Sequence, residues 1–249
     1  MTSAWQAAAG DVIAALRPLG TPERAAQEKR YLKSDLEFLG VTLPDLRRVV
    51  TAAARQHPGL GRDDVIVWAL TLWTGAEWQG VLWEQRMAAV ELLRLRVRDL
   101  AAADLATIET LIRAAAGWAL VDPLAGDIAG QIVLRDAAGW RDIDRWADDE
   151  DFWLRRSALL SLLPGIRAGQ PDLARFDRYA TPMLGEKEFF IRKAIGWVLR
   201  DLSKKDPAYV IGWTGRHLAA MSGVTFREAV RRLPEADAGR LSQQRSDRR

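Results

Sequence analysis

Apolar residues recur at every third or fourth position along almost the whole chain, as in the stretch 83–95. This spacing places them on one face of an α-helix, whereas half-buried β-strands would show strict alternation, which this sequence lacks. The pattern therefore predicts an all-α fold. Glycine and proline interrupt it only at short breaks, with no long Ser/Gly linker. We expect one continuous helical domain over residues 1–239 and a flexible basic tail over residues 240–249.

An aromatic residue returns near the start of successive helical stretches. The intervals are 35, 35, 37 and 36 positions, and the residues are Trp83, Trp118, Trp153, Phe190 and Phe226. A period of this length is typical of stacked helix pairs, and the Trp-x2-Leu-Gly-x2-Tyr signature of tetratricopeptide repeats is missing. We therefore expect a HEAT-like helical repeat solenoid, whose concave face such proteins use for binding.

Basic residues follow three of these aromatics at the third position: Arg86, Arg156 and Lys193. That spacing keeps the ring and the cation on one helix face. The repeat that begins at Trp118 differs, because it has an acid, Asp122, at the fourth position and Pro123 directly after it. A local departure from a repeat is a candidate functional site. Asp before Pro is also typical of a helix start, so an N-cap is the alternative interpretation of Asp122.

Charge is unevenly distributed along the chain, although the formal net charge is only +3. Residues 175–249 hold 16 Lys and Arg against 9 Asp and Glu, whereas residues 1–174 hold 20 against 24. A basic surface neutralises phosphates and releases counterions, which supplies most non-specific affinity for DNA. The basic C-terminal part of the chain is therefore a candidate DNA-binding surface.

The composition excludes several other kinds of site. The chain has no cysteine, and its two histidines, His57 and His217, are far apart, so neither a zinc site nor another metal cofactor is expected. No apolar run is long enough to span a bilayer, and the first residues lack the layout of a signal peptide. We expect a cytoplasmic protein that needs no cofactor.

The stretch 187–200 combines aromatic bulk with positive charge over about four helical turns. Phe189, Lys193 and Trp197 stand at i, i+4 and i+8, so a cation and two rings follow one helical stripe. A DNA-binding wall has this pattern, and so does an amphipathic helix with a solvated basic edge. We expect Trp197 to face the binding surface, and Phe189 and Phe190 to belong to the core.

Several segments together resemble the DNA alkylation repair glycosylases of the AlkD type, which are built from HEAT-like repeats. The resemblance covers residues 23–233. It rests on Arg30-Tyr-Leu-Lys, Phe38-Leu-Gly-Val with Pro44, Trp118-Ala-Leu-Val-Asp122, Phe152-Trp-Leu-Arg-Arg156, the run 187–200 and Arg227-Glu-Ala-Val. It implies a monomeric, monofunctional 3-methyladenine/7-methylguanine DNA glycosylase that acts on duplex DNA at the nucleoid.

The resemblance also implies roles for individual residues. The catalytic aspartate falls on Asp122, the two groove tryptophans on Trp118 and Trp197, and the arginine near the lesion on Arg156. The residues implied or expected to contact DNA are Tyr31, Arg156, Arg192, Lys193, Arg200 and Arg227. The sequence departs from the family at Leu43, where threonine is common, and at the apolar pair 119–120.

The residue types suit this chemistry. A purine alkylated at N3 or N7 is cationic and already a good leaving group, so the enzyme has to stabilise the oxocarbenium-like sugar. A carboxylate beside the sugar can oppose that charge and orient the attacking water. Indole faces attract cations, and arginine binds phosphate bidentately. The family implies that the lesion is handled in the open duplex, without the closed pocket of base-flipping glycosylases.

Two other functions stay open at the level of sequence: a non-catalytic module that binds bent or branched DNA, and a protein-binding helical scaffold. Asp122 favours the enzyme, because binding alone needs no carboxylate in the groove.

The acidic run 148–151 is interpreted as a helix start and Leu163-Pro-Gly-Ile166 as a turn between helices. The remaining tryptophans are expected to pack in the core: Trp5, Trp68, Trp73, Trp78, Trp140, Trp146 and Trp213.

Overall fold

The computed structural model describes residues 2–75, 81–115 and 117–247, and these residues are predominantly helical. Within these ranges no β-strand forms, and the one extended pairing is an isolated bridge between Glu37 and Leu82. The all-α expectation is confirmed. Trp78 lies outside the described residues, so its expected packing role is untested.

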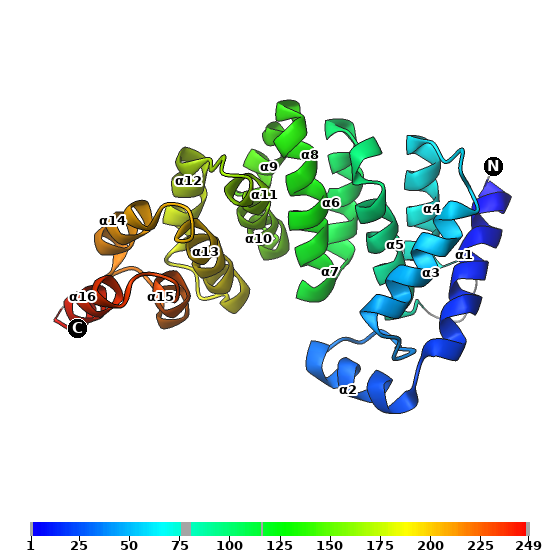
Figure 1. Cartoon of the computed structure of the whole chain (residues 1–249), viewed down its shortest axis with the longest axis horizontal. Coiled ribbons are helices and arrows are strands. Elements are labelled where there is room, and N and C mark those ends of the chain that lie inside the picture. The colour runs from blue at the N-terminus through cyan, green and yellow to red at the C-terminus, as the bar shows by residue number, and fades with distance from the viewer. Residues whose placement is uncertain (1, 76–80, 116, 248–249) are drawn as a thin grey trace. The chain divides into compact units, whose positions relative to one another are not determined.

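Internal contacts divide the chain into two units, residues 1–124 and 125–249, where the sequence predicted one continuous domain. The α-helices of unit 1 follow each other in Figure 1 from blue to green. They are α1 Thr2–Leu16, α2 Pro22–Leu32, α3 Leu43–Arg55, α4 Arg62–Thr74, α5 Trp83–Leu95, α6 Leu105–Ala114 and α7 Trp118–Asp122. Helix α4 packs on α1 and α5, and α3 packs on α1 and α5. The core of unit 1 includes Val65, Leu92, Leu93, Leu105 and Ile108, all fully buried.

Unit 2 continues the helical succession after a π-helical segment, Pro123–Ala129, in which the division between the units falls. Its α-helices are α8 Gly130–Arg135, α9 Trp140–Trp146, α10 Phe152–Leu160, α11 Leu163–Arg167, α12 Leu173–Met183, α13 Phe189–Leu202, α14 Pro207–His217, α15 Gly223–Val230 and α16 Glu235–Ser246. Helix α13 packs most extensively on α15 and also on α10. The largest buried side chains of unit 2 are Trp146, Trp213 and Phe176.

The predicted period is confirmed by the positions at which helices begin. Trp83 and Trp118 are the first residues of α5 and α7, Trp153 and Phe190 are the second residues of α10 and α13, and Phe226 is the fourth residue of α15. Capping residues account for several of these starts. Asp151, the last residue of the acidic run 148–151, accepts a 2.8 Å hydrogen bond from the backbone N–H of Trp153, so the predicted helix start is confirmed.

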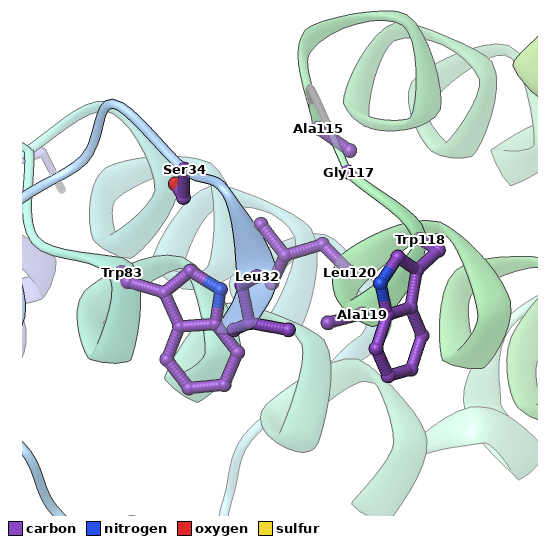
Figure 2. Close-up of a pocket in the computed structure, with 8 residues that line it drawn as sticks. All are labelled: Leu32, Ser34, Trp83, Ala115, Gly117, Trp118, Ala119 and Leu120. Atoms are coloured by element: carbon purple, nitrogen blue, oxygen red, sulfur yellow. The ribbon is translucent and has the colours of Figure 1, made fainter. Parts of the chain in front are cut away.

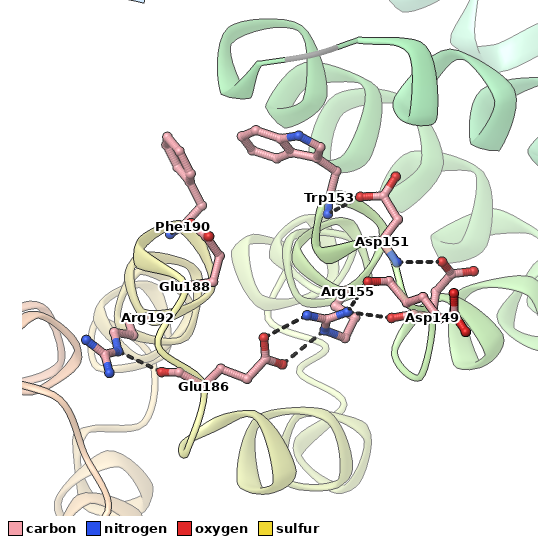
Figure 3. A network of polar contacts seen from close by, with 9 residues as sticks. Asp149, Asp151, Trp153, Arg155, Glu186, Glu188, Phe190 and Arg192 are labelled. Atoms are coloured by element: carbon pink, nitrogen blue, oxygen red, sulfur yellow. Dashed lines mark hydrogen bonds and ion pairs between the residues drawn. The ribbon is translucent and has the colours of Figure 1, made fainter.

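Polar contacts between side chains one repeat apart join neighbouring helix pairs within unit 2. Figure 3 shows Arg155 of α10 forking onto both carboxylate oxygens of Glu186, at 3.0 and 2.8 Å, while Arg192 Nε donates to the Glu186 carbonyl at 2.7 Å. Trp213 Nε1 likewise donates to Asp177 at 2.7 Å, across 36 positions. The contacts of Arg155 with Glu186 and of Trp213 with Asp177 span 31 and 36 positions, roughly the sequence period, because equivalent positions of successive repeats face each other.

Two local expectations from the sequence are wrong. The segment Leu163–Arg167 is a short helix, α11, because proline is tolerated in the first turn of a helix, where its missing N–H costs nothing. Residues 240–246, expected as part of a flexible tail, belong to α16. Leu241 is buried there, and Arg245 donates to the Met221 carbonyl at 2.7 Å and stacks on Phe226, which ties this helix to α15.

Most of the tryptophans expected to pack do so. Trp68, Trp73, Trp146 and Trp213 are at most 4% exposed. Trp5 stacks on Trp68 at a centroid distance of 5.4 Å, and Trp140 lies under the guanidinium of Arg175 at 4.3 Å. None of the described helices combines the length and apolarity that a membrane crossing requires.

Candidate functional site

Helix α7 carries the residue pair that the sequence singles out in unit 1. It begins at Trp118, directly after Gly117, and ends at Asp122. Leu120 and Val121 are fully buried, whereas Trp118 and Asp122 are partly exposed. Residues four apart lie on the same helix face, so the indole and the carboxylate share the accessible side of α7.

The N-cap interpretation of Asp122 is wrong, because a helix precedes this residue and the chain stays helical after it. Pro123 has no N–H to donate to the carbonyl four residues earlier, and the backbone adopts the wider π-helical pattern over Pro123–Ala129 instead of starting a new helix. Insertions of π-helix are frequent at functional sites. Asp122 thus ends an α-helix at the point where the helical pattern changes.

Tyr31 stands beside Trp118 at the edge of a pocket in unit 1. It lies in the last turn of α2, is 71% exposed, and meets Trp118 edge to face with ring centroids 6.0 Å apart. The pocket is a small depression open to solvent. Figure 2 shows the indoles of Trp83 and Trp118 on opposite sides of it. The lining residues are Leu32, Ser34, Trp83, Ala115, Gly117, Trp118, Ala119 and Leu120.

A buried carboxylate, Glu84, fixes the segment between α2 and α3. It is 0% exposed and accepts hydrogen bonds from the backbone N–H groups of residues 39, 40 and 41, at 2.9, 2.7 and 3.2 Å. Gly40 has φ +79° and approaches the start of α2 so closely that a Cβ there would lie 2.3 Å from the Thr21 carbonyl oxygen. Next to Glu84, Trp83 stacks on Phe38 with centroids 5.4 Å apart. Helix α5 therefore holds the loop that leads away from Tyr31.

In unit 2, helix α13 presents a stripe of partly exposed residues, Lys193, Trp197 and Arg200, opposite its buried face. Glu228 of α15 accepts a 2.5 Å hydrogen bond from Lys193 Nζ and also pairs with Arg200. Burial raises the pKa of Glu228, but the hydrogen bond from Lys193 and the charge of Arg200 outweigh this and hold the pKa below its usual range. The two cations that flank Trp197 are thus held by one carboxylate.

The close packing of α15 on α13 depends on Gly196. A Cβ at this position would lie 2.6 Å from the Cβ of Glu228 and 3.1 Å from the Thr225 carbonyl oxygen. Thr225 Oγ1 in turn donates to the Arg192 carbonyl at 3.0 Å. The absence of a side chain at residue 196 allows Glu228 to reach both cations beside Trp197.

The other residues nominated from the sequence occupy varied positions in unit 2. Arg156 is 3% exposed, donates from Nη1 to the Phe190 carbonyl at 2.5 Å, and lies 5.7 Å from the Phe190 ring centroid. Arg227 is exposed. Phe189, expected in the core, is 53% exposed, because it begins α13 and leaves Phe190 to pack against Trp153 at 4.9 Å.

Comparison with known proteins decides the family. The family model described as DNA alkylation repair enzyme matches residues 12–233. The chain belongs to this family. Among solved structures, a predicted DNA alkylation repair enzyme from Enterococcus faecalis aligns with a TM-score of 0.73 at 22% identity, over 87% of this chain and 97% of its own. AlkD2 from Streptococcus mutans aligns with a TM-score of 0.52 at 15% identity, over 85% and 98%. A search of curated proteins gives no significant match.

Membership of the DNA alkylation repair enzyme family confirms the resemblance found in the sequence, and the two solved structures support the all-helical fold. Among the residues that the structure describes, no group of His, Asp and Glu side chains is arranged to hold a metal ion.

Sequence reasoning missed two carboxylates in this DNA alkylation repair enzyme, Glu84 and Glu228. Glu84 stands in a helix that is apolar on almost every side, which is an unusual environment for an acid and is a signal available from the sequence. Glu228 gives no such signal, because it lies opposite the apolar stripe of α15. The sequence does not identify the partners of either acid, because Glu84 binds residues more than 40 positions earlier and Glu228 binds residues 28 and 35 positions earlier.

Proposed function

We propose that this DNA alkylation repair enzyme is a monofunctional glycosylase that hydrolyses the N-glycosidic bond of cationic N3- or N7-alkylated purines in duplex DNA. The observation that carries the proposal is the pairing of Trp118 and Asp122 on the accessible side of α7. An indole face and a carboxylate, one turn apart, supply the two groups that a cationic nucleotide requires. Tyr31, against Trp118, adds a hydroxyl group at the same edge.

The reaction proceeds by loss of the base from the sugar. The alkylated purine carries a positive charge and leaves without a strong general acid, taking the electrons of the glycosidic bond with it. Positive charge then develops on the deoxyribose, and the carboxylate of Asp122 opposes it and orients the attacking water toward C1′. The products are the free alkylated base and an abasic site.

Trp118 binds the cationic nucleotide through its ring face, an interaction worth about 0.5–2 kcal/mol depending on desolvation. In unit 2 we assign a second aromatic contact with DNA to Trp197 and phosphate contacts to Arg192, Lys193, Arg200 and Arg227. Arg156, expected from the sequence to bind phosphate, is 3% exposed and donates to the Phe190 carbonyl, so we assign it to holding the start of α13. Arg200 is 22% and Lys193 38% exposed at the side chain, so both keep N–H donors for a phosphate while paired with Glu228.

The decisive experiment incubates the purified protein with N-methylated duplex DNA and quantifies released 7-methylguanine and 3-methyladenine by chromatography. We expect release well above the spontaneous rate. Release at the spontaneous rate, with intact affinity for the duplex, would favour the non-catalytic DNA-binding module instead. A protein without salt-dependent affinity for DNA would be a protein-binding scaffold.

Asp122→Asn tests the assignment of the carboxylate. Because the amide keeps the shape but not the charge, we expect excision to fall about 100-fold or more while affinity for the duplex persists. Asp127→Asn is the matched control, since Asp127 is an exposed carboxylate of the following segment and should keep the full rate. An Asp122→Asn protein with the excision rate of the Asp127→Asn protein would rule out the proposed role.

A further inference from the structure

Arg86 of α5 has a cationic side chain whose hydrogen bonding is incomplete. Its Nη1 donates to the Ala114 carbonyl at 2.7 Å, and its guanidinium lies 5.0 Å from the Trp73 ring centroid. Its Nε is buried without a hydrogen-bond acceptor. Among the described residues, no carboxylate lies within ion-pair distance of Arg86, whereas Arg47, Arg62 and Arg94 of unit 1 each pair with an acid.

A partly buried guanidinium without a counter-charge is unfavourable in the free protein. Burial lowers the pKa of Arg86, and none of the acids that the structure describes offsets this. The Nε atom is enclosed by the protein, but the Arg86 side chain as a whole is partly exposed, so a ligand can reach other N–H groups of the guanidinium.

Arg86, with its incomplete hydrogen bonding, lies close to the pocket of unit 1. Trp83, one turn earlier on α5, lines the pocket, and the carbonyl that Arg86 binds belongs to the residue before Ala115, which also lines it. Arg86 therefore stands at the margin of the pocket between Trp83 and Trp118. The contact with Trp73 and the hydrogen bond to Ala114 restrict the guanidinium before any ligand arrives, which reduces the entropic cost of binding.

The internal repeat shows how Arg86 is held. Arg86 is the third residue after Trp83, as Arg156 is the third after Trp153. Each donates from Nη1 to a backbone carbonyl of a later helical segment, and each lies over an aromatic ring. The two differ in exposure, because Arg156 is 3% exposed whereas Arg86 is partly exposed, so Arg86 is the one of the two that a ligand can reach.

We infer that Arg86 binds a backbone phosphate of the DNA at the margin of the Trp83–Trp118 pocket. This inference deepens the proposed function and rests on it for the identity of the ligand. The remaining N–H groups of the guanidinium donate to the phosphate oxygens, and the phosphate supplies the missing counter-charge. Arg86 makes no contact with the reacting sugar in this scheme and acts in binding alone.

The test measures binding of a fluorescent duplex by anisotropy, from about 50 to about 200 mM salt, for wild type, Arg86→Gln and Arg94→Gln. We expect Arg86→Gln to bind about tenfold more weakly at low salt and to reduce the slope of log K against log salt by about 1, equally for methylated and unmethylated DNA. Arg94 lies on the same helix but is paired with Glu91 at 2.6 Å, so Arg94→Gln controls for the loss of one charge and should match wild type.

Circular dichroism and thermal unfolding establish that each variant is folded. If Arg86→Gln is unfolded, Arg86→Met, which keeps an apolar stem on Trp73, takes its place under the same criteria. A folded Arg86 variant with the affinity and salt slope of Arg94→Gln would overturn the inference and leave Arg86 a packing residue. Excision of methylpurines is measured in parallel, so that a wild-type protein that binds DNA without excision counts against the proposed activity and not against Arg86.

Discussion

Replacing Glu84 with alanine is expected to be among the most destabilising single changes in unit 1. The carboxylate is 0% exposed and accepts three backbone N–H groups, from residues 39, 40 and 41. Its removal leaves these three donors without their acceptor, next to Gly40, whose left-handed φ of +79° depends on the loop staying in place. The chain between α2 and α3 would then lose its attachment to α5.

The magnitude follows from the number and kind of hydrogen bonds. A hydrogen bond to a charged group contributes about 1.5–3 kcal/mol net, but water can reach part of this loop once the carboxylate is gone. We therefore expect Glu84→Ala to lose about 3–5 kcal/mol of the free energy of unfolding, the range for removing one partner of a buried charged contact. Glu84→Gln keeps one oxygen acceptor but turns an NH₂ toward a backbone donor, and should lose about 2 kcal/mol.

Urea unfolding followed by tryptophan fluorescence and far-ultraviolet circular dichroism measures these losses. Glu37→Gln is the control in the same unit, because Glu37 pairs with Lys29 at 2.7 Å but its side chain is 72% exposed. A surface pair of this kind should contribute at most about 1 kcal/mol. If Glu84→Ala unfolded at the urea concentration of Glu37→Gln, the three hydrogen bonds would not hold the loop, and the argument from burial would fail.

Two further predictions concern unit 2. Gly196→Ala should cost about 1–3 kcal/mol in urea unfolding, because its Cβ would lie 2.6 Å from that of Glu228, whereas Gly185→Ala, with open space around it, should cost less than half as much. Burial raises the pKa of Asp144, but hydrogen bonds from Arg175 and Tyr179 outweigh this and lower it overall. The stabilisation from this carboxylate is therefore present above the unfolded pKa of about 3.9 and is lost as the pH falls through the lower folded value. The melting temperatures of wild type and Asp144→Asn should differ at pH 7, and the difference should shrink as the pH falls below the unfolded pKa; a gap that stays constant would contradict this linkage.

The repeat, the helices and their starts could be predicted because they depend on local order in the sequence. The period of Trp83, Trp118 and Trp153 marks three helix starts, and the acidic run ending at Asp151 provides a cap. Such signals lie within one or two helical turns of the element that they specify. The same kind of signal was misleading at Asp122, because an acid before proline also fits a continuing helix when the backbone changes to the π-helical pattern.

Part of the candidate site depends on contacts over long distances in sequence, and these could not be predicted. No pattern within α5 indicates that Glu84 binds the loop at residues 39–41, or that Arg86 reaches Ala114. The exposure of Phe189 has a similar origin. Both Phe189 and Phe190 were expected in the core, but only Phe190 packs on Trp153, which leaves it half-buried and Phe189 exposed.

The number of basic residues in a segment does not by itself show how many of them can bind phosphate. The excess of cations in residues 175–249 suggested many phosphate contacts, yet Lys193 and Arg200 share Glu228, and Arg192 Nε is bonded to a backbone carbonyl. A cation that already has a carboxylate partner gains less from a phosphate than one without, because binding exchanges one ion pair for another. By this reasoning Arg86, which has no carboxylate partner among the residues that the structure describes, gains more from a phosphate than either paired cation of α13, although it lies in the segment 1–174, whose net charge is negative. The charge that matters for DNA binding is therefore the charge left unpaired by the fold, which the amino-acid composition cannot reveal.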